Sequence, residues 1–411
     1  MRKENLKGGR ISGKKTGYQC AVKVKVVGVG GGGGNAVSRM SDDFVRGVEF
    51  IAVNTDLQDL ELCHVRKKIH IGKNLTGGLG AGMNPEMGAR SVEENKNEIV
   101  EALSGADLIF LTAGFGGGTG TGALPVVAEI AKENGILTVA VITKPFSFEG
   151  VQRSRIAQEG IVKLRDKVDA LIVIPNDRIF SIINKDTPIV KAFLEIDEVL
   201  KNAVQGIVDL IVTPGIINVD FADVKTVMQN AGSAIVGVGV AGGQERAIDA
   251  VRQAINSPLL EVSADGAKGV LFGVSGGRDL KMTEINEAAK IITEAVDPSA
   301  KIIFGAYYDK KLKLGQIKVT VIATGFSDAR PALGSLFSSG SILSAGMSGR
   351  ATDTTKKEGS FLTIETEKKE EFLPFSTEKR NSSGSGISKE KEEKRSESVW
   401  DIPTFLRRKK K

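Results

Sequence analysis

Two glycine-rich segments, each directly after a short apolar run, limit the possible folds of this chain more than any other feature. Residues 28–35 read GVGGGGGN, and residues 114–122 read GFGGGTGTG. Glycine lets backbone amides approach a phosphate closely, and a helix that begins in such a segment adds a favourable potential for an anion. The two segments therefore predict two phosphate-binding loops, each between a strand and a helix.

The pattern around these loops predicts the fold class of the first half. Short apolar runs alternate with amphipathic stretches, which is typical of a doubly wound parallel α/β sheet. Such a sheet binds its ligand at the carboxyl ends of its strands, where the glycine-rich loops fall. The predicted strands are residues 22–29, 48–53, 107–112 and 136–143, and predicted helices include 86–103 and 122–134.

A long helix is predicted at residues 188–213. Pro188 is a start signal, Pro214 marks the end, and apolar residues recur at steps of three and four from Ile189 to Ile211. Such a helix can lie between two domains and serve both. A smaller α/β domain is predicted at residues 214–326. Its expected strands lie near 235–240, 269–274, 301–306 and 317–323, and its helices near 243–255 and 282–295.

Both ends of the chain have the composition of tails. Residues 1–21 form a predicted flexible basic extension; residues 8–14 there read GxxxxGK, but Lys15 replaces the Ser or Thr of a P-loop and no strand precedes it. Residues 327–398, rich in Ser, Gly, Lys and Glu, predict a disordered linker. Residues 399–411 carry the only Trp, Trp400, among other apolar side chains. We interpret them as a docking peptide, and the alternative is a tail that happens to be apolar.

Composition excludes several classes of protein. The 411 residues contain no apolar run long enough for a transmembrane helix, and we expect no secretory signal. Cys20 and Cys63 are too few for a disulfide framework, so a reducing cytoplasm is expected. Zinc at Cys63 and His64 is not expected, because adjacent residues rarely share a tetrahedral site. The net charge of +6 is concentrated in the tails, so we expect no nucleic-acid partner.

The first loop alone does not distinguish a dehydrogenase from an enzyme that binds a polyphosphate. Gly28, Gly30 and Gly33 also fit the GxGxxG fingerprint of dehydrogenases. The second loop argues against that alternative, because two loops at two strand ends suit a polyphosphate held from both sides. No hydride-transfer site is visible in the second half either. The predicted contacts in the two loops are Gly31, Gly32, Gly33, Gly34, Asn35, Gly117, Gly118, Thr119, Gly120 and Thr121.

The string GGGTGTG at residues 116–122 is the signature of tubulin-like GTPases, and residues 22–325 resemble the FtsZ family without a large gap. The resemblance implies a GTP-binding domain at residues 22–187, with GTP or GDP and Mg²⁺ as ligands. It also implies that the loop at residues 75–85 senses the γ-phosphate. Met83 stands where the family often has Ala, which leaves Ala81 and Gly82 as the expected contacts.

The same resemblance assigns the sugar and the base. Glu149 would accept a hydrogen bond from a ribose hydroxyl, and Arg153 would reach phosphate or sugar; alternatively, Glu149 caps its helix and Arg153 pairs with Glu149. Asn176 and Asp197 match the family's guanine contacts, since a carboxylate can accept from both N1–H and the exocyclic amine of guanine. Phe193, one turn before Asp197, would stack on the base or belong to the core.

In the family, the loop past the long helix supports hydrolysis, and Asn218, Asp220 and Asp223 stand at its positions here. From Phe193 onward the helix is roughly 27 Å long. The two aspartates therefore cannot reach the nucleotide of their own subunit and are expected to meet that of the next molecule. The alternative is an ordinary acidic helix cap.

The resemblance implies a self-assembling GTPase that forms head-to-tail filaments. These filaments would form the division ring at mid-cell in the cytoplasm, and residues 399–411 would bind membrane-tethering and regulatory division proteins without direct membrane insertion. A filament-forming GTPase with another role, such as DNA segregation, is the remaining alternative.

Overall fold

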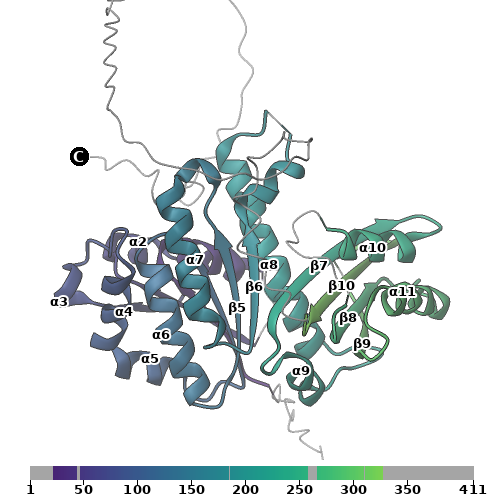
Figure 1. The fold of residues 1–411 in the computed structure, drawn as a ribbon. Coiled ribbons are helices and arrows are strands. Elements are labelled where there is room, and N and C mark those ends of the chain that lie inside the picture. Colours follow the sequence, from purple (N-terminus) through teal and green to yellow (C-terminus); the bar gives the residue numbers. More distant parts are fainter. Residues whose placement is uncertain (1–21, 44–46, 185, 258–265, 310, 327–411) are drawn as a thin grey trace, which may run out of the picture. The chain divides into compact units, whose positions relative to one another are not determined.

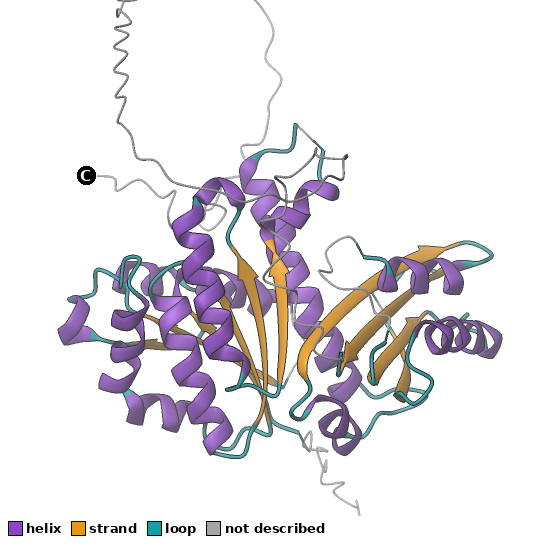
Figure 2. Cartoon of the chain, viewed as in Figure 1, coloured by secondary structure: helices purple, strands orange, loops and turns teal. Residues whose placement is uncertain are grey.

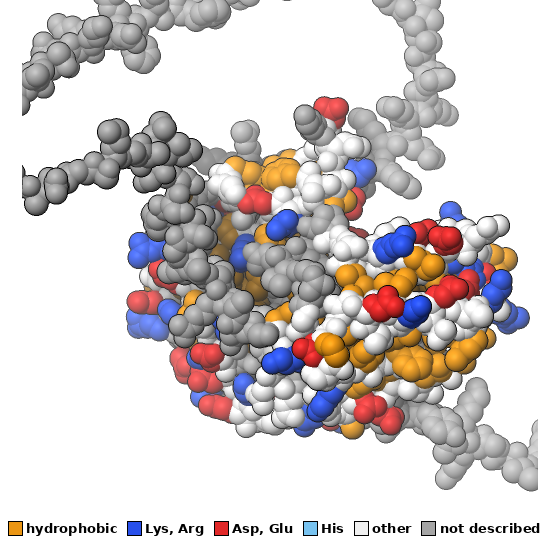
Figure 3. Space-filling model, turned by 45° about the vertical axis from the view of Figure 1, so that its right-hand side comes forward, with side chains coloured by type: hydrophobic (Ala, Val, Ile, Leu, Met, Phe, Trp, Pro, Cys, Tyr) orange, Lys and Arg blue, Asp and Glu red, His pale blue; other side chains and the backbone are white. Residues whose placement is uncertain are grey.

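The computed structural model describes residues 22–43, 47–184, 186–257, 266–309 and 311–326. The predictions for the N-terminal extension, the linker and the docking peptide lie outside the described residues. Among the helices described, none combines the length and apolarity that crossing a membrane requires. On the face shown in Figure 3, acidic and basic side chains are interspersed.

A ten-stranded sheet runs through the described part of the chain, in the order β3-β2-β1-β4-β5-β6-β7-β10-β8-β9 (Figures 1 and 2). Its first six strands pair in parallel, as predicted for a doubly wound sheet. They are β1 (Val24–Val29), β2 (Val48–Asn54), β3 (Lys67–His70), β4 (Leu108–Gly114), β5 (Leu137–Lys144) and β6 (Ala170–Pro175).

Helices cover both faces of the parallel sheet, because alternate side chains of each strand point to opposite sides. In β1, Val24 and Val26 pack with α1 and the long helix, whereas Val27 and Val29 face α4 to α7. All four valines are buried. The helices are α1 (Gly30–Asp43), α2 (Leu57–Leu62), α3 (Lys73–Thr76), α4 (Pro85–Glu94), α5 (Lys96–Leu103), α6 (Thr119–Glu133) and α7 (Val151–Arg165).

The predicted helix at residues 86–103 is wrong as a single element. It is broken at Asn95, which ends α4 and precedes α5 with φ −112° and ψ 26°. The Asn95 side chain accepts a hydrogen bond of 2.9 Å from the Gly72 amide, so the break anchors the loop after β3. The helix predicted at 122–134 begins earlier, at Thr119, because the TGTG sequence forms its first turn.

The long helix is confirmed as α8 (Ile189–Val212), whose 24 residues correspond to roughly 36 Å. Pro188 precedes the first helical residue as its N-cap, rather than lying in the first turn. The helix buries an apolar stripe against the sheet along most of its length. Residues of this stripe include Leu200, Ala203, Val204, Ile207 and Val208.

The C-terminal half continues the same sheet. Strand β7 pairs in parallel with β6 over only three residue pairs, 170–172 with 232–234. Strand β10 lies antiparallel between β7 and β8, and β9 forms the edge. Helices α10 and α11 pack on these strands in a separate core. The elements are α9 (Phe221–Met228), β7 (Gly232–Gly242), α10 (Arg246–Ile255), β8 (Gly269–Gly276), α11 (Met282–Ala295), β9 (Lys301–Tyr308) and β10 (Gln316–Thr324).

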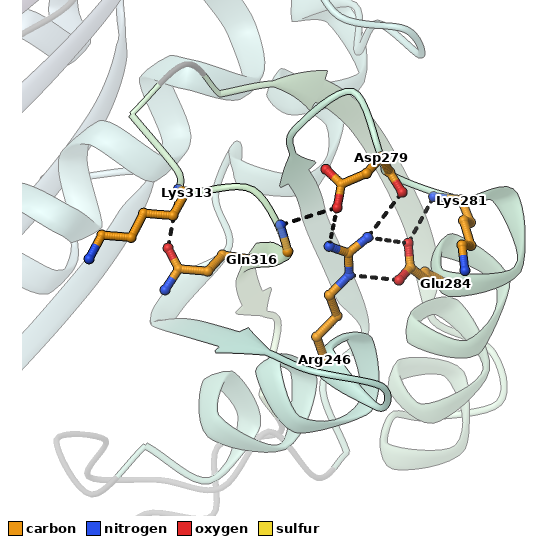
Figure 4. Close-up of polar contacts among 7 residues, drawn as sticks. Arg246, Asp279, Lys281, Glu284, Lys313 and Gln316 are labelled. Atoms are coloured by element: carbon orange, nitrogen blue, oxygen red, sulfur yellow. Dashed lines mark hydrogen bonds and ion pairs between the residues drawn. The ribbon is translucent and has the colours of Figure 1, made fainter.

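A buried arginine joins three loops at one end of the C-terminal strands (Figure 4). The guanidinium of Arg246 donates to both carboxylate oxygens of Glu284, and to the carboxylate and backbone carbonyl of Asp279. Asp279 also accepts from the Gly315 amide in the turn before β10. These bonds hold the pKa of Asp279 below its usual value and raise that of Arg246.

Candidate functional site: a nucleotide-sized cavity

A cavity of about 410 Å³ lies at the carboxyl ends of the parallel strands, where the fold class predicts a ligand. It is lined by the loops after β1, β2, β3, β4, β5 and β6, and by side chains of α1, α7 and α8. Most of the predicted nucleotide contacts line it together. These are Gly31, Gly32, Asn35, Ala81, Gly82, Gly117, Gly118, Thr119, Gly120, Glu149, Arg153, Asn176, Phe193 and Asp197.

Three predicted contacts lie outside this lining. A Cβ on Gly33 would lie 2.4 Å from the Thr112 carbonyl oxygen, so this glycine allows α1 to approach β4. A Cβ on Gly34 would lie 3.0 Å from the Cys63 sulfur. The Thr121 hydroxyl accepts a hydrogen bond of 2.9 Å from the Gly116 amide. These residues support the loops from behind rather than line the cavity.

Close backbone contact between the loops explains why glycine is required at two positions. The Gly118 amide donates a hydrogen bond of 2.8 Å to the Gly82 carbonyl, and a Cβ on Gly118 would lie 2.5 Å from that oxygen. Gly30 has φ +73°, and a Cβ there would lie 2.9 Å from the Gly120 nitrogen. The backbones of the loops after β1, β3 and β4 therefore pack directly against one another in the wall of the cavity.

Sequence reasoning missed the loop after β2. Asn54, Asp56 and Asp59 line the cavity. Asn54 donates a hydrogen bond of 2.9 Å to Asp59, and Asp56 caps α2 through its Oδ1 atom. The strand-end rule could have found this loop, because it directly follows the predicted strand 48–53. The other lining residues that were not predicted are Gly30, Arg39, Leu79, Gly80, Gly114, Phe115, Thr143, Pro145, Ile196 and Leu200.

The residues around the phosphate loops fit Mg²⁺, which prefers oxygen ligands and is usually bound by one or two carboxylates together with substrate phosphates. Asp56 supplies a carboxylate beside the Gly80 turn, where a Cβ on Gly80 would lie 3.8 Å from Asp56 Oδ2. In the described part of the chain, no group of three or more His, Cys, Asp or Glu side chains could hold a metal ion.

The part of the cavity formed by α1, α8 and the loop after β6 has polar groups suited to a base. The Asn176 side-chain oxygen is buried, and no hydrogen-bond donor of the described residues reaches it. Asp197 pairs with Arg39 of α1, and burial raises the pKa of Asp197 to about 6 although Arg39 lowers it. Phe193 lines the cavity and also meets the Phe146 ring edge-on at 5.4 Å, so stacking and core packing are compatible roles.

Both alternatives weighed for Glu149 and Arg153 are present in the structure. Glu149 accepts a hydrogen bond of 2.9 Å from the Phe146 amide, and Arg153 donates one of 3.0 Å to Glu149. Both side chains nevertheless line the cavity. Local pairing therefore holds them at the wall, where a ligand could meet them.

The loop past α8 lies away from this cavity, since none of its residues contributes to the lining. Asp220 and Asp223 are exposed. Asp220 occupies the N-cap position of α9, yet its side chain accepts no capping hydrogen bond. The Asn218 side chain accepts a hydrogen bond of 2.7 Å from the Gly215 amide and so shapes the loop. The capping alternative therefore does not account for Asp220, whereas Asp223 lies in the first turn of α9, where an acidic side chain is favourable.

Comparisons with known proteins agree with this arrangement. The model of the Tubulin/FtsZ family GTPase domain matches residues 23–184, and that of the FtsZ family C-terminal domain matches residues 232–327. An empty FtsZ dimer from M. jannaschii is 47% identical, with 75% of this chain and 89% of that chain covered and a TM-score of 0.71. A tryptophan-to-tyrosine mutant of FtsZ from M. jannaschii is 46% identical, with 74% and 91% covered and a TM-score of 0.71.

A GTPgS-bound protofilament of CetZ2 from Haloferax volcanii is also similar, at 23% identity, with 75% of this chain and 95% of that chain covered and a TM-score of 0.65. This last likeness concerns the fold. Fold and site together define a GTPase of the tubulin-like class. Within that class, the chain belongs to the FtsZ family.

Proposed function

We propose that this GTPase hydrolyses GTP at the contact between successive subunits of a head-to-tail filament. The observation that carries the proposal is the separation of the two parts of the site. The cavity is lined by α8 residues from Phe193 to Leu200, whereas Asp220 and Asp223 follow the other end of α8, roughly 18 Å of helix beyond Leu200. Both carboxylates are exposed and would meet the nucleotide of a neighbouring subunit.

Within the cavity, the loops after β1, β3 and β4 would bind the phosphates through their backbone amides. Glu149 and Arg153 would contact the ribose, and Asn176 and Asp197 the guanine. The buried, unpartnered Asn176 oxygen supports this placement, because a guanine donor would satisfy it.

Catalysis would depend on positioning, which is where most of the acceleration in phosphoryl transfer arises. Asp220 and Asp223 of the arriving subunit would orient the attacking water, and Asn218 would keep their loop in shape. Asp56, with the arriving aspartates, would hold Mg²⁺. When bound, Mg²⁺ would offset the negative charge of the phosphate oxygens. Hydrolysis would then weaken the contact between subunits.

A contact that repeats head to tail without closing produces filaments. The M. jannaschii FtsZ dimer and the CetZ2 protofilament support self-association in the superfamily. We infer that the filament forms the division ring at mid-cell in the cytoplasm. Residues 399–411, which lie outside the described residues, would recruit membrane-tethering and regulatory division proteins.

GTP turnover measured against protein concentration tests the proposal. Activity per molecule should rise with concentration and vanish in dilute solution, because each site needs a neighbour. Asp223→Ala should bind GTP normally and hydrolyse it poorly. A turnover per molecule that does not change with concentration would overturn the shared site.

Mixing two defective variants sharpens the test. Gly118→Val should not bind GTP, because a Cβ at this position would lie 2.5 Å from the Gly82 oxygen. Asp223→Ala has an intact cavity, and the Gly118 variant has an intact loop. Mixing them should restore part of the activity at the interfaces where an intact loop meets a loaded cavity. No recovery despite demonstrated co-assembly would contradict the proposal.

A further inference from the structure

Arg39 is a charged side chain of the cavity wall to which the proposed function gives no role. It lies on α1 and contacts Asp197 on α8, 158 positions later in the sequence. Both side chains line the base end of the cavity, and they are only 21% and 17% exposed. The pair therefore faces the place where guanine would bind.

Guanine recognition requires Asp197 to be ionised. A carboxylate offers about four lone-pair positions, whereas a protonated carboxyl carries a donor that would face the N1–H or the amine of the base. Arg39 contacts one oxygen, Oδ2. Lone pairs on both oxygens remain available, so Arg39 and guanine can bind the same carboxylate together.

The surroundings of Asp197 oppose its ionisation. Burial raises its pKa to about 6, and within the described residues Arg39 is the charged side chain that counteracts burial. The other charged groups of the cavity wall are engaged elsewhere: Glu149 pairs with Arg153, Asp56 caps α2, and Asp59 accepts a hydrogen bond from Asn54. The other side chains that α1, α8 and the loop after β6 contribute to the lining are neutral, namely Asn35, Asn176, Phe193, Ile196 and Leu200.

We propose that Arg39 is a positioning residue for guanine recognition, which holds Asp197 ionised and turns its free lone pairs toward the base. This inference rests on the guanine-binding role proposed above for Asp197. Arg39 acts on the nucleotide through Asp197, and it makes affinity for guanine nucleotides independent of pH in the neutral range.

The test is the pH dependence of GDP binding to the full chain, measured by calorimetry between pH 5.5 and 8.5. GDP avoids turnover during the measurement. At each pH, the dissociation constant of Arg39→Gln is divided by that of the wild type, which cancels the titration of the GDP phosphates. Arg155→Gln is the matched control, because Arg155 is an exposed arginine of α7 that pairs with Glu159 outside the cavity lining.

For Arg39→Gln, the ratio should grow by up to roughly tenfold per pH unit as pH falls through the neutral range. It should level off below about pH 6, where Asp197 of the wild type also takes up a proton. For Arg155→Gln, the ratio should stay near one throughout. A ratio for Arg39→Gln that is constant over the whole range would overturn the proposal, since a purely structural role has no reason to follow pH.

A second substitution separates this inference from the proposed function. In an Asp197→Asn background, Arg39→Gln should add no pH-dependent loss, because the titrating group is gone. If Asp197→Asn alone leaves GDP affinity unchanged, the guanine-binding role of Asp197 fails. If Asp197→Asn weakens binding but Arg39→Gln follows the wild-type pH profile, only the role of Arg39 fails.

Arg39→Lys provides a readout even if the Gln variant does not fold, which circular dichroism and thermal unfolding would reveal. Lysine keeps the positive charge but not the planar fork of arginine. The Lys variant should follow the wild-type pH profile and bind GDP several-fold more weakly at pH 8. A Lys variant with wild-type affinity, or with a shifted pH profile, would contradict the proposal.

Discussion

At the scale of single residues, Asn176 combines burial with an unused hydrogen-bonding atom. Its side-chain oxygen is buried and has no hydrogen-bond donor among the described residues. A buried acceptor without a partner costs roughly 1–3 kcal/mol. A structure retains such an atom at a cost in stability, and a ligand that supplies a donor would recover that cost.

Asn176→Leu should therefore weaken GDP binding by roughly 1–3 kcal/mol while leaving the ligand-free protein as stable as the wild type, or more stable. Calorimetry and thermal unfolding measure the two effects. Asn134→Leu is the control with the opposite pattern: its side chain donates to Ile130 at the end of α6, so stability should fall and binding should not change. Loss of stability without loss of binding in Asn176→Leu would contradict this prediction.

The buried carboxyl group of Asp209 should make the free energy of unfolding depend on pH. The side chain is 7% exposed, with Lys318 Nζ 3.9 Å from its Oδ2. Burial raises the pKa of Asp209 to about 6, so the folded state holds its proton more tightly than the unfolded state. Stability is therefore lost as pH rises from about 4 to about 6, by up to about 3 kcal/mol, and the loss persists at neutral pH.

Asp209→Asn stays neutral and should avoid this loss. Its free energy of unfolding relative to the wild type should increase between pH 4.5 and pH 7.5, by about 2 kcal/mol. Lys318 already lowers the pKa of Asp209, so the loss of this partner in the variant does not reduce the expected difference. Denaturant titrations at the two pH values measure the difference. The same difference at both values would show that Asp209 has an ordinary pKa in the folded protein.

At the scale of elements, Arg246 holds the start of α10 to the loop after β8 and, through Asp279, to the turn before β10. Arg246 is buried with the Glu284 carboxylate, whereas Asp279 is 37% exposed, and removing one partner of a buried pair typically costs roughly 3–5 kcal/mol. Arg246→Ala should therefore lower the free energy of unfolding by about that amount. Arg252→Ala, at an exposed position of the same helix, should cost roughly 0.5 kcal/mol or less. Equal stability of the two variants would contradict the structural role of the cluster.

Periodicity predicted most strands and the long helix, because their apolar patterns are local. The break at Asn95 depends on the Gly72 amide, 23 residues away, which periodicity cannot reveal. The antiparallel insertion of β10 between β7 and β8 escaped prediction for the same reason. In the site, the glycine-rich loops could be predicted from the sequence, because each directly follows a predicted strand. Arg39 was missed because its helix pattern is ordinary and its partner is distant in sequence.

At the scale of the whole molecule, the predicted linker separates the C-terminal peptide from the folded part. Removing residues 399–411 should leave GTP turnover and filament formation unchanged, and should abolish binding to membrane-tethering partners. Turnover and sedimentation of filaments measure the first effect, and co-sedimentation with a tethering partner measures the second. A truncated chain that no longer hydrolyses GTP would contradict the independence of the peptide.

The loop that carries the two aspartates also covers a strand edge. Strand β9 ends the sheet, and the Ile216 and Ile217 amides donate to its Ala306 carbonyl while the Ala306 amide donates to Ile217. An uncovered edge is a template for pairing with any other strand, which leads to disordered aggregation. At Ala306 the loop therefore occupies the edge of β9, which hinders pairing with another strand there, while in the proposed filament it would present its carboxylates to the next subunit. In the proposed filament, ordered growth along one axis and protection from aggregation along another would depend on the same few backbone hydrogen bonds.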